Sequence, residues 1–248
     1  MIPLKSENDL RMLKRSGEIL AKVLRELEKK VKAGISTRQI DALAEELISA
    51  QDALAAFKGY KGFPAAVCTS INEEIVHGVP SDRVLVEGDI IGLDIGVKYK
   101  GYFSDAAITI PIGKVSPKIK KLINVTQKAL AEGIKEARAG NHLLDISARI
   151  QRHVEANGFS VVRQFVGHGI GLNLHEEPEI PNFGRSHQGP ILKEGMVLAI
   201  EPMVNMGGWE AEILDNGWTA VTKDRLASAH FEHTVAITAN GPEILTSY

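Results

Sequence analysis

Two aspartates stand in a stretch of sequence that otherwise has the composition of a protein core. Asp94 lies in the run IIGLDIGV and Asp105 in the run FSDAAITI, and the segment KYKGY joins the two. The runs predict a β-hairpin over residues 90–110, because a Lys-Gly pair between apolar segments is typical of a tight turn. A turn with loop residues 99 and 100 sets the aspartates directly opposite each other, and a turn centred on residues 100 and 101 sets them diagonal on one face.

Like charges that face each other on an apolar hairpin destabilise it unless something neutralises them, and a cation is the simplest neutraliser. The alternative is that one aspartate caps a turn while the other forms an ion pair at the surface. The neighbours of Asp94 and Asp105 are mostly Ile, Leu and Ala, which leaves little exposed surface for that alternative. The hairpin by itself leaves both interpretations open.

Two further carboxylates lie in apolar strand-like segments, Glu201 in MVLAIEPMV and Glu232 in HFEHTVAI, and the Gly-rich segment FVGHGIGLNL supplies His168. Four buried carboxylates around one divalent ion keep a net negative charge, whereas two ions that share bridging carboxylates balance it. An oxygen-rich site with one nitrogen suits Mn, Fe, Co or Zn. A single histidine in such a segment is more often a structural residue, so the role of His168 stays open at this point.

Other motifs with a known chemistry fail in this sequence. The glycines after residue 166 do not complete G-x-G-x-x-G, because Leu172 takes the last position, and the segment that begins at His175 does not complete H-E-x-x-H. There is no G-x-S-x-G, and the lone Cys68 excludes an intrachain disulfide and a cysteine zinc site.

Capping residues predict the first two helices. Ser6 with Asp9 opens a helix whose apolar stripe continues until Gly34 stops it, and Ser36 with Gln39 opens a second, shorter helix. Short strands separated by glycine and proline then lead into the hairpin.

The second part of the chain repeats this order. A third helix is expected from Ser116-Pro117 to Gly140, a fourth ends at residues 157–158, and short strands follow. Aligning the Ala-Gly stops of the first and third helices carries Asp94 to within one residue of Glu201. We therefore expect one catalytic domain over residues 1–248, with duplicated halves at roughly 5–112 and 113–245.

Composition narrows the class of protein. With 248 residues and 44% apolar content the chain can build a full core, and a net charge of −2 gives no field that would attract DNA or a membrane. The lysines of residues 118–121 are expected on the solvated face of a helix. The N-terminus lacks an apolar signal core, and no run reaches the ~18 apolar residues of a spanning helix, so we expect a cytoplasmic protein.

The segments GHGIGLNLHEEP, IEPMV, FEHTVAIT and the LDIG and YFSDAA pair resemble the type I methionine aminopeptidases, and the similarity runs from about Lys5 to Leu245. The resemblance implies the α+β pita-bread fold, in which pseudo-twofold related halves form a curved antiparallel sheet covered by helices. It also implies two divalent metal ions per chain, held by five ligands: Asp94, Asp105, His168, Glu201 and Glu232.

The same resemblance assigns residues that contact the substrate. His77, in INEEIVHGVP, and His175 match the two substrate-contacting histidines of the family. Tyr60, Cys68 and Trp218 match its methionine pocket, whereas Phe63 and Leu174 stand where the bacterial enzymes more often have Tyr and Phe. Without the family, each of these apolar residues would be read as ordinary core.

The implied activity is removal of the initiator methionine from nascent proteins and peptides whose second residue is small. A hydroxide activated by both ions would attack the first peptide bond, with His77, His175 and Glu201 as catalytic residues and Glu201 as the proton carrier. The expected partners are nascent N-termini, which could be met at the ribosome, and the expected state is a monomer that binds neither DNA nor membranes.

Spacing argues for the minimal type I form. The segment between His175 and Glu201 is too short for the helical insertion of type II enzymes, and nothing before the first helix could be a zinc-binding extension. Prolidases and aminopeptidase P are the alternatives within the fold, but they resemble longer chains with an extra N-terminal domain. A binding module that kept the fold without the chemistry is the other alternative, and it should have lost metal ligands.

Overall fold

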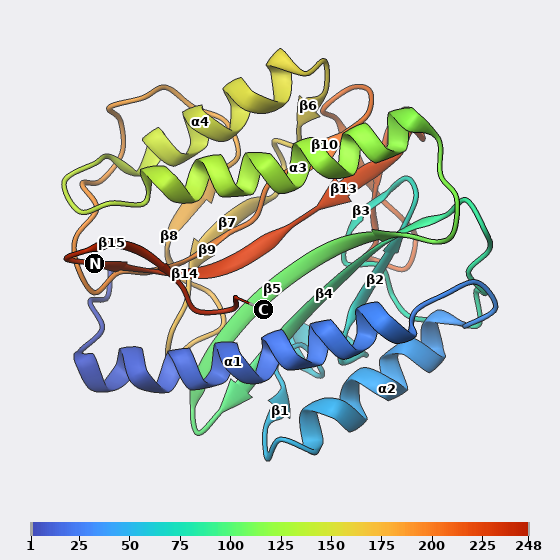
Figure 1. Cartoon of the computed structure of the whole chain (residues 1–248), viewed down its shortest axis with the longest axis horizontal. Coiled ribbons are helices and arrows are strands. Elements are labelled where there is room, and N and C mark those ends of the chain that lie inside the picture. Colours follow the sequence, from blue (N-terminus) through green and yellow to red (C-terminus); the bar gives the residue numbers. More distant parts are fainter. Residues whose placement is uncertain (1, 248) are drawn as a thin grey trace.

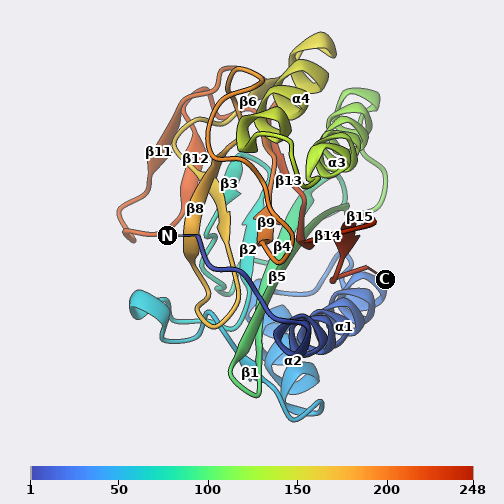
Figure 2. The same ribbon diagram turned by 90° about the vertical axis from the view of Figure 1, so that its left-hand side faces the viewer.

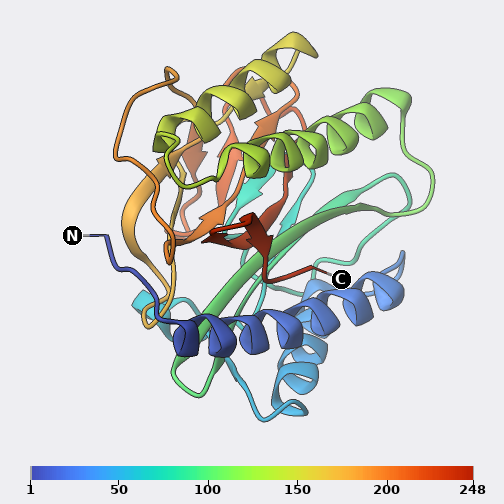
Figure 3. The same ribbon diagram turned by 60° about the vertical axis from the view of Figure 1, so that its left-hand side comes forward.

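The computed structural model describes residues 2–247, which form a curved antiparallel sheet with two pairs of helices on one face (Figure 1). In Figure 2 both pairs lie on the same side of the sheet, and Figure 3 shows strand β15 between them. This arrangement confirms the α+β class, since one face of the sheet is covered by helices and the other is left for a site.

The helices begin where their capping residues predict. The helices are α1 (Glu7–Lys30), α2 (Thr37–Ser49), α3 (Pro117–Glu136) and α4 (Leu143–Ala156). Ser6 and Ser36 each form a complete capping box, and Ser116 caps α3 with Pro117 in the first turn. Two of the predicted ends are too late: α1 ends at Lys30 and α3 at Glu136. The two predicted stop glycines instead adopt positive φ in the turns that follow.

One large sheet contains nine strands within the described residues, in the order β1-β4-β5-β14-β9-β7-β8, with β2 also on β4 and β15 also on β14. The strands are β1 (Leu54–Ala55), β2 (Cys68–Ile71), β4 (Ile90–Tyr99), β5 (Tyr102–Pro111), β7 (Val166–Gly169), β8 (Glu176–Pro181), β9 (Val197–Ile200), β14 (Glu232–Thr238) and β15 (Gly241–Ile244). The central strands of this sheet are almost fully buried, so their inner positions are screened from water.

Two small three-stranded sheets and one short helical turn complete the fold. They are β13-β10-β6 and β11-β12-β3, with the 3-10 helix η1 (Tyr60–Gly62) before β2. Their strands are β3 (Glu74–Val76), β6 (Ser160–Val161), β10 (Met203–Asn205), β11 (Ala211–Ile213), β12 (Ala220–Thr222) and β13 (Ser228–His230). Among residues 2–247, no helix has the length and apolarity needed to cross a membrane.

The hairpin forms with the second of the two predicted registers. Tyr99 pairs with Tyr102, so the turn is centred on Lys100-Gly101, and both turn residues have positive φ. Asp94 pairs with Ala107 and Asp105 with Gly96. The two aspartates are therefore diagonal neighbours on one face of the sheet, and not a directly opposed pair.

The two parts of the chain contribute matching elements in the same order. Residues 5–112 supply α1, α2, β4 and β5, and residues 113–245 supply α3, α4, β9 and β14. In the sheet β5 lies beside β14, with β4 and β9 outside them. We propose from this order that the two halves arose by duplication within one catalytic domain.

Candidate metal centre

Four acidic side chains come together on the face of the sheet that the helices do not cover. Asp94 lies on β4, Asp105 on β5 and Glu232 at the start of β14, and these three strands are neighbours in the sheet. Glu232 pairs with Ala107, the residue that also pairs with Asp94. The sequence predicted Glu201 inside a strand, but β9 ends at Ile200 and Glu201 is the next residue. Antiparallel register thus gathers carboxylates that are far apart in sequence.

His168 joins this cluster from β7, on the other side of β9. Its Nε2 atom lies 3.6 Å from Oε1 of Glu201 and 3.9 Å from Oδ2 of Asp105. One donor atom each from Asp105, His168 and Glu232 lie within 4.8 Å of one another. Donors that are each about 2.1 Å from one metal ion lie about 3 to 3.5 Å apart, so these three could close around a single ion with small movements.

The protonation of His168 suits a ligand. Its Nδ1 atom lies 2.9 Å from the carbonyl oxygen of Gly169, which can only accept a hydrogen bond. Nδ1 therefore carries the proton in the neutral ring, and the lone pair of Nε2 points at the carboxylates. Most metal-binding imidazoles are oriented in this way, by a hydrogen bond from the ring nitrogen that does not bind the metal.

The carboxylates lack partners that would satisfy their charge. Asp94 Oδ1, Asp105 Oδ1 and Glu232 Oε1 are buried and accept no hydrogen bond within the described part of the chain. Buried, unpaired carboxylate oxygens are strongly destabilising unless they coordinate a cation. These orphaned atoms show that the residues fit a bound metal, which the sequence predicted from charge balance.

The pKa values of the four carboxylates also indicate that their charges are not satisfied. Burial raises the pKa of Asp94 to about 7 and the pKa of Glu201 to about 7. Burial together with the charges of the neighbouring carboxylates raises the pKa of Asp105 and of Glu232 well above the usual range. The cluster therefore retains protons in the metal-free protein, and a divalent cation would displace them.

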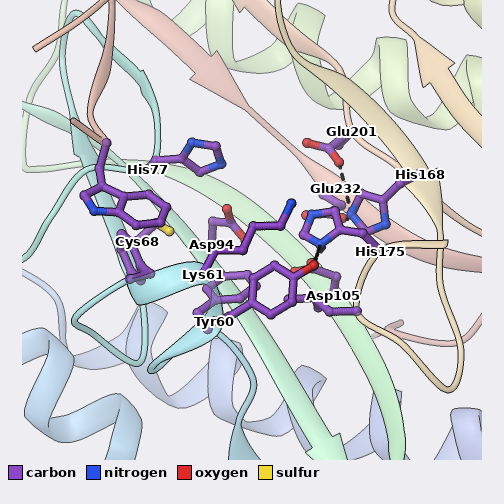
Figure 4. Close-up of a pocket in the computed structure, with 14 residues that line it drawn as sticks. Tyr60, Lys61, Cys68, His77, Asp94, Asp105, His168, His175, Glu201 and Glu232 are labelled. Atoms are coloured by element: carbon purple, nitrogen blue, oxygen red, sulfur yellow. Dashed lines mark hydrogen bonds and ion pairs between the residues drawn. The ribbon is translucent and has the colours of Figure 1, made fainter.

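Two more histidines line the cavity: Figure 4 shows His175 beside His168, and His77 on the other side of the cavity. The Nδ1 atom of His175 lies 2.9 Å from the hydroxyl of Tyr60, and the His175 ring lies 4.1 Å from the ring of His168. Burial lowers the pKa of His77 to about 4, and burial with the nearby His168 lowers the pKa of His175 to about 3. Both rings are therefore neutral at pH 7 and can donate a hydrogen bond without carrying a charge.

A cavity of about 160 Å³ opens directly onto these groups. All twelve residues that the sequence selected line it: Tyr60, Phe63, Cys68, His77, Asp94, Asp105, His168, Leu174, His175, Glu201, Trp218 and Glu232. Phe63 and Trp218 meet edge to face, with ring centres 5.2 Å apart, and form one apolar wall. Burial raises the pKa of the Cys68 thiol well above its usual value, so Cys68 belongs to this wall as a neutral group.

Three residues near the cluster were missed from the sequence. Phe57 and Lys61 line the cavity, and Figure 4 shows the Lys61 side chain reaching across it between His77 and His175. His230 has its Nε2 atom 3.5 Å from Oε2 of Glu201. The available signal for His230 was its position two residues before Glu232, because alternate residues of an extended chain face the same side.

Comparison with known proteins places this geometry in a family. The sequence model of metallopeptidase family M24 matches residues 11–239. This chain belongs to metallopeptidase family M24. The methionine aminopeptidase of Clostridium perfringens is 52% identical over 246 residues, which cover 99% of both chains. The resemblance to the bacterial-type methionine aminopeptidases is thereby confirmed over nearly the full length.

Solved structures of the family confirm the pita-bread fold. The methionine aminopeptidase of Thermotoga maritima superposes with a TM-score of 0.98 at 44% identity and full coverage of both chains. The prolidase of Pyrococcus furiosus reaches a TM-score of 0.79 at 23% identity, and this chain covers 65% of it. The prolidase therefore shares the fold alone, whereas the aminopeptidases match in sequence and length. This difference disfavours the prolidase alternative.

Proposed function

We propose that this chain removes the N-terminal methionine from proteins and peptides whose second residue is small. The observation that carries the proposal is an apolar cavity that opens directly onto a cluster of carboxylates and imidazoles fit for metal ions. Such a cavity holds an apolar side chain next to a hydrolytic centre, as an aminopeptidase specific for methionine requires. The full-length relatives named methionine aminopeptidase support it.

The metal centre would hold two divalent ions through Asp94, Asp105, His168, Glu201 and Glu232. Two ions balance four carboxylates, and Co, Mn, Fe and Zn all suit this donor set. When bound, the ions supply a hydroxide at neutral pH and polarise the carbonyl of the first residue. Asp105 and Glu232 lie on the adjacent central strands β5 and β14 and would hold the ions from the middle of the sheet.

Residues of the chain would then handle protons and charge. Glu201 lies at the edge of the cavity with an exposed side-chain fraction of 12%, and is the proposed proton carrier between water and the leaving amine. A hydroxyl proton donated by Tyr60 to Nδ1 of His175 leaves the Nε2 proton of that ring for the cavity. His175 and His77 would donate such protons to the oxygen that gains negative charge.

The pocket would select methionine by shape. Tyr60, Phe63, Cys68, Leu174 and Trp218 form apolar walls, and an unbranched thioether can enter a slot that β-branched side chains cannot. An apolar slot discriminates by about 1 to 3 kcal/mol per methylene, so norleucine should be a tolerable substitute and leucine a poor one. The second residue should be small because it would lie beside the two histidines.

The remaining partner assignments belong to the same proposal. The substrates would be the N-termini of nascent polypeptides in the cytoplasm, met at the ribosome as they emerge. We propose that the chain acts as a monomer, since all twelve predicted site residues meet at one cavity within a single chain. We assign no role to DNA, since the net charge of −2 offers it no general attraction.

The test is a metal-stripped sample with single metals added back, assayed on a Met-Ala-Ser peptide. Peptides beginning norleucine-Ala, Leu-Ala and Met-Leu measure the two specificities by kcat/KM. Equal rates on Met-Ala and Leu-Ala would identify a broad aminopeptidase and contradict the proposed pocket.

Asp105→Ala should abolish turnover and metal-dependent stabilisation together, because a proposed metal ligand is lost. Asp89→Ala is the matched control, since Asp89 is also buried but lies outside the cavity lining. Normal hydrolysis by Asp105→Ala would show that Asp105 is not a ligand.

A further inference from the structure

His230 is a buried imidazole beside the proposed metal centre that no assigned ligand set contains. It is the last residue of β13, and only 3% of it is exposed. Its backbone is held at both ends by the Thr109 hydroxyl, which accepts from its N–H and donates to its carbonyl. The ring is thus presented to the cluster by a rigid backbone.

The Nε2 atom of this ring has no hydrogen-bond partner within the described part of the chain. It lies 3.5 Å from Oε2 of Glu201, and one donor atom each from Glu201, His230 and Glu232 lie within 4.8 Å of one another. Leaving a buried polar nitrogen without a partner is costly, so its position beside two carboxylates calls for a further group.

The geometry of His230 matches that of His168 around Glu201. His168 Nε2 lies 3.6 Å from Oε1, and His230 Nε2 lies 3.5 Å from Oε2, so each carboxylate oxygen faces one imidazole. Both distances are longer than a good hydrogen bond and near the roughly 3 to 3.5 Å that separate two donors on one metal ion. His230 therefore lies at the same distance from Glu201 as His168, the proposed imidazole ligand.

We propose that His230 is a nitrogen ligand of the metal centre, which gives the centre a second imidazole on the side of Glu201 Oε2. This inference rests on the proposed metal-dependent function. A second imidazole makes the donor set softer, and it should favour Co, Zn or Fe over Mn, which prefers carboxylate and water. The alternative is that His230 only donates a hydrogen bond to Glu201 and orients it.

X-ray absorption of the metal-stripped protein reloaded with two equivalents of cobalt counts the imidazoles directly. Outer-shell ring scattering should correspond to about one imidazole per cobalt, twice the value expected if His168 were the sole nitrogen ligand. In His230→Leu this scattering should fall by half, and cobalt affinity measured by calorimetry should fall on the order of 10-fold or more.

Two variants separate coordination from other effects. His230→Gln can still hydrogen-bond to Glu201 but offers cobalt no imidazole, so it should bind cobalt as weakly as His230→Leu. His153→Leu is the matched control, because His153 also has a buried, unpartnered Nε2 atom but lies on α4 outside the cavity lining. It should keep the wild-type scattering and affinity.

The overturning results are distinct from those that would overturn the proposed function. Wild-type protein that binds cobalt with half the expected imidazole scattering, or a His230→Gln variant with restored affinity, would show that His230 is not a ligand and leave the aminopeptidase proposal intact. Wild-type protein that binds no cobalt at all would contradict the metal centre itself and both proposals with it.

Discussion

Replacing Asp94 by asparagine should stabilise the metal-free protein while weakening its response to metal. The pKa of Asp94 lies at about 7 in the fold and near 3.8 in an unfolded chain. A difference of one pKa unit between the folded and unfolded states corresponds to about 1.4 kcal/mol. The ionised Asp94 carboxylate therefore destabilises the metal-free fold by on the order of 4 kcal/mol. Asparagine removes the charge at nearly constant volume.

The sign of the pH dependence follows from the raised pKa. Between pH 4 and 7 the folded protein holds protons on Asp94 and Glu201 that the unfolded chain has released, so metal-free stability falls as the pH rises through this window. At pH 5 Asp94 is already protonated, and Asp94→Asn should melt close to wild type. At pH 8 the variant should melt at a higher temperature than wild type. The buried amide must itself find hydrogen bonds, which offsets part of the gain, so we expect an increase of roughly 4 °C or more.

The assay is thermal unfolding by circular dichroism in EDTA at pH 5 and pH 8, repeated with cobalt. Cobalt should raise the melting temperature of wild type more than that of Asp94→Asn, because the variant lacks an anionic ligand. Asp89→Asn is the control: the buried Asp89 carboxylate accepts hydrogen bonds from Asn72 Nδ2 and Val86 N, so this variant should be destabilised at pH 8. The reasoning would be refuted if Asp94→Asn in EDTA were destabilised equally at both pH values.

Three further variants test the assigned roles by steady-state kinetics and metal titration. His77→Ala should keep its metal and lose on the order of 10² or more in turnover, and loss of metal would move His77 into the coordination sphere. Leu174→Phe should sharpen the preference for methionine over norleucine or leave it unchanged, so a relaxed preference would contradict the pocket. Tyr60→Phe removes the hydroxyl that hydrogen-bonds to His175 and should lower kcat roughly 3- to 10-fold with little change in KM. An unchanged kcat would show that this hydrogen bond does not contribute to turnover.

Local rules predicted the parts of this fold that local interactions determine. Ser6, Ser36 and Ser116 cap their helices as expected, because capping depends on residues within one turn. The hairpin was predicted with two registers, since the sequence of KYKGY allows either turn. Positive φ at Lys100 and Gly101 decides between them, and Asp94 and Asp105 stay on one face either way.

The site depended on longer-range information. Single carboxylates in apolar strands indicated Asp94, Asp105, Glu201 and Glu232, but only the strand order brings β14 between β5 and β9 and so joins them. The resemblance supplied the pocket walls, which composition could not separate from ordinary core. Lys61 was overlooked because an exposed lysine in a Gly-rich turn gives no signal until the turn is folded over the cavity.

The burial of the carboxylate cluster explains both the affinity expected for metal and the instability expected without it. Ala107 is buried on the same face of the sheet as the cluster, where it limits the approach of water, and an unscreened carboxylate attracts a cation more strongly and repels its neighbours more strongly. A bound metal ion therefore removes the repulsion that destabilises the metal-free fold, which couples metal binding to folding. A variant that admits water beside Asp94 should consequently weaken metal binding and raise metal-free stability together, whereas a change that merely disrupts packing should lower both.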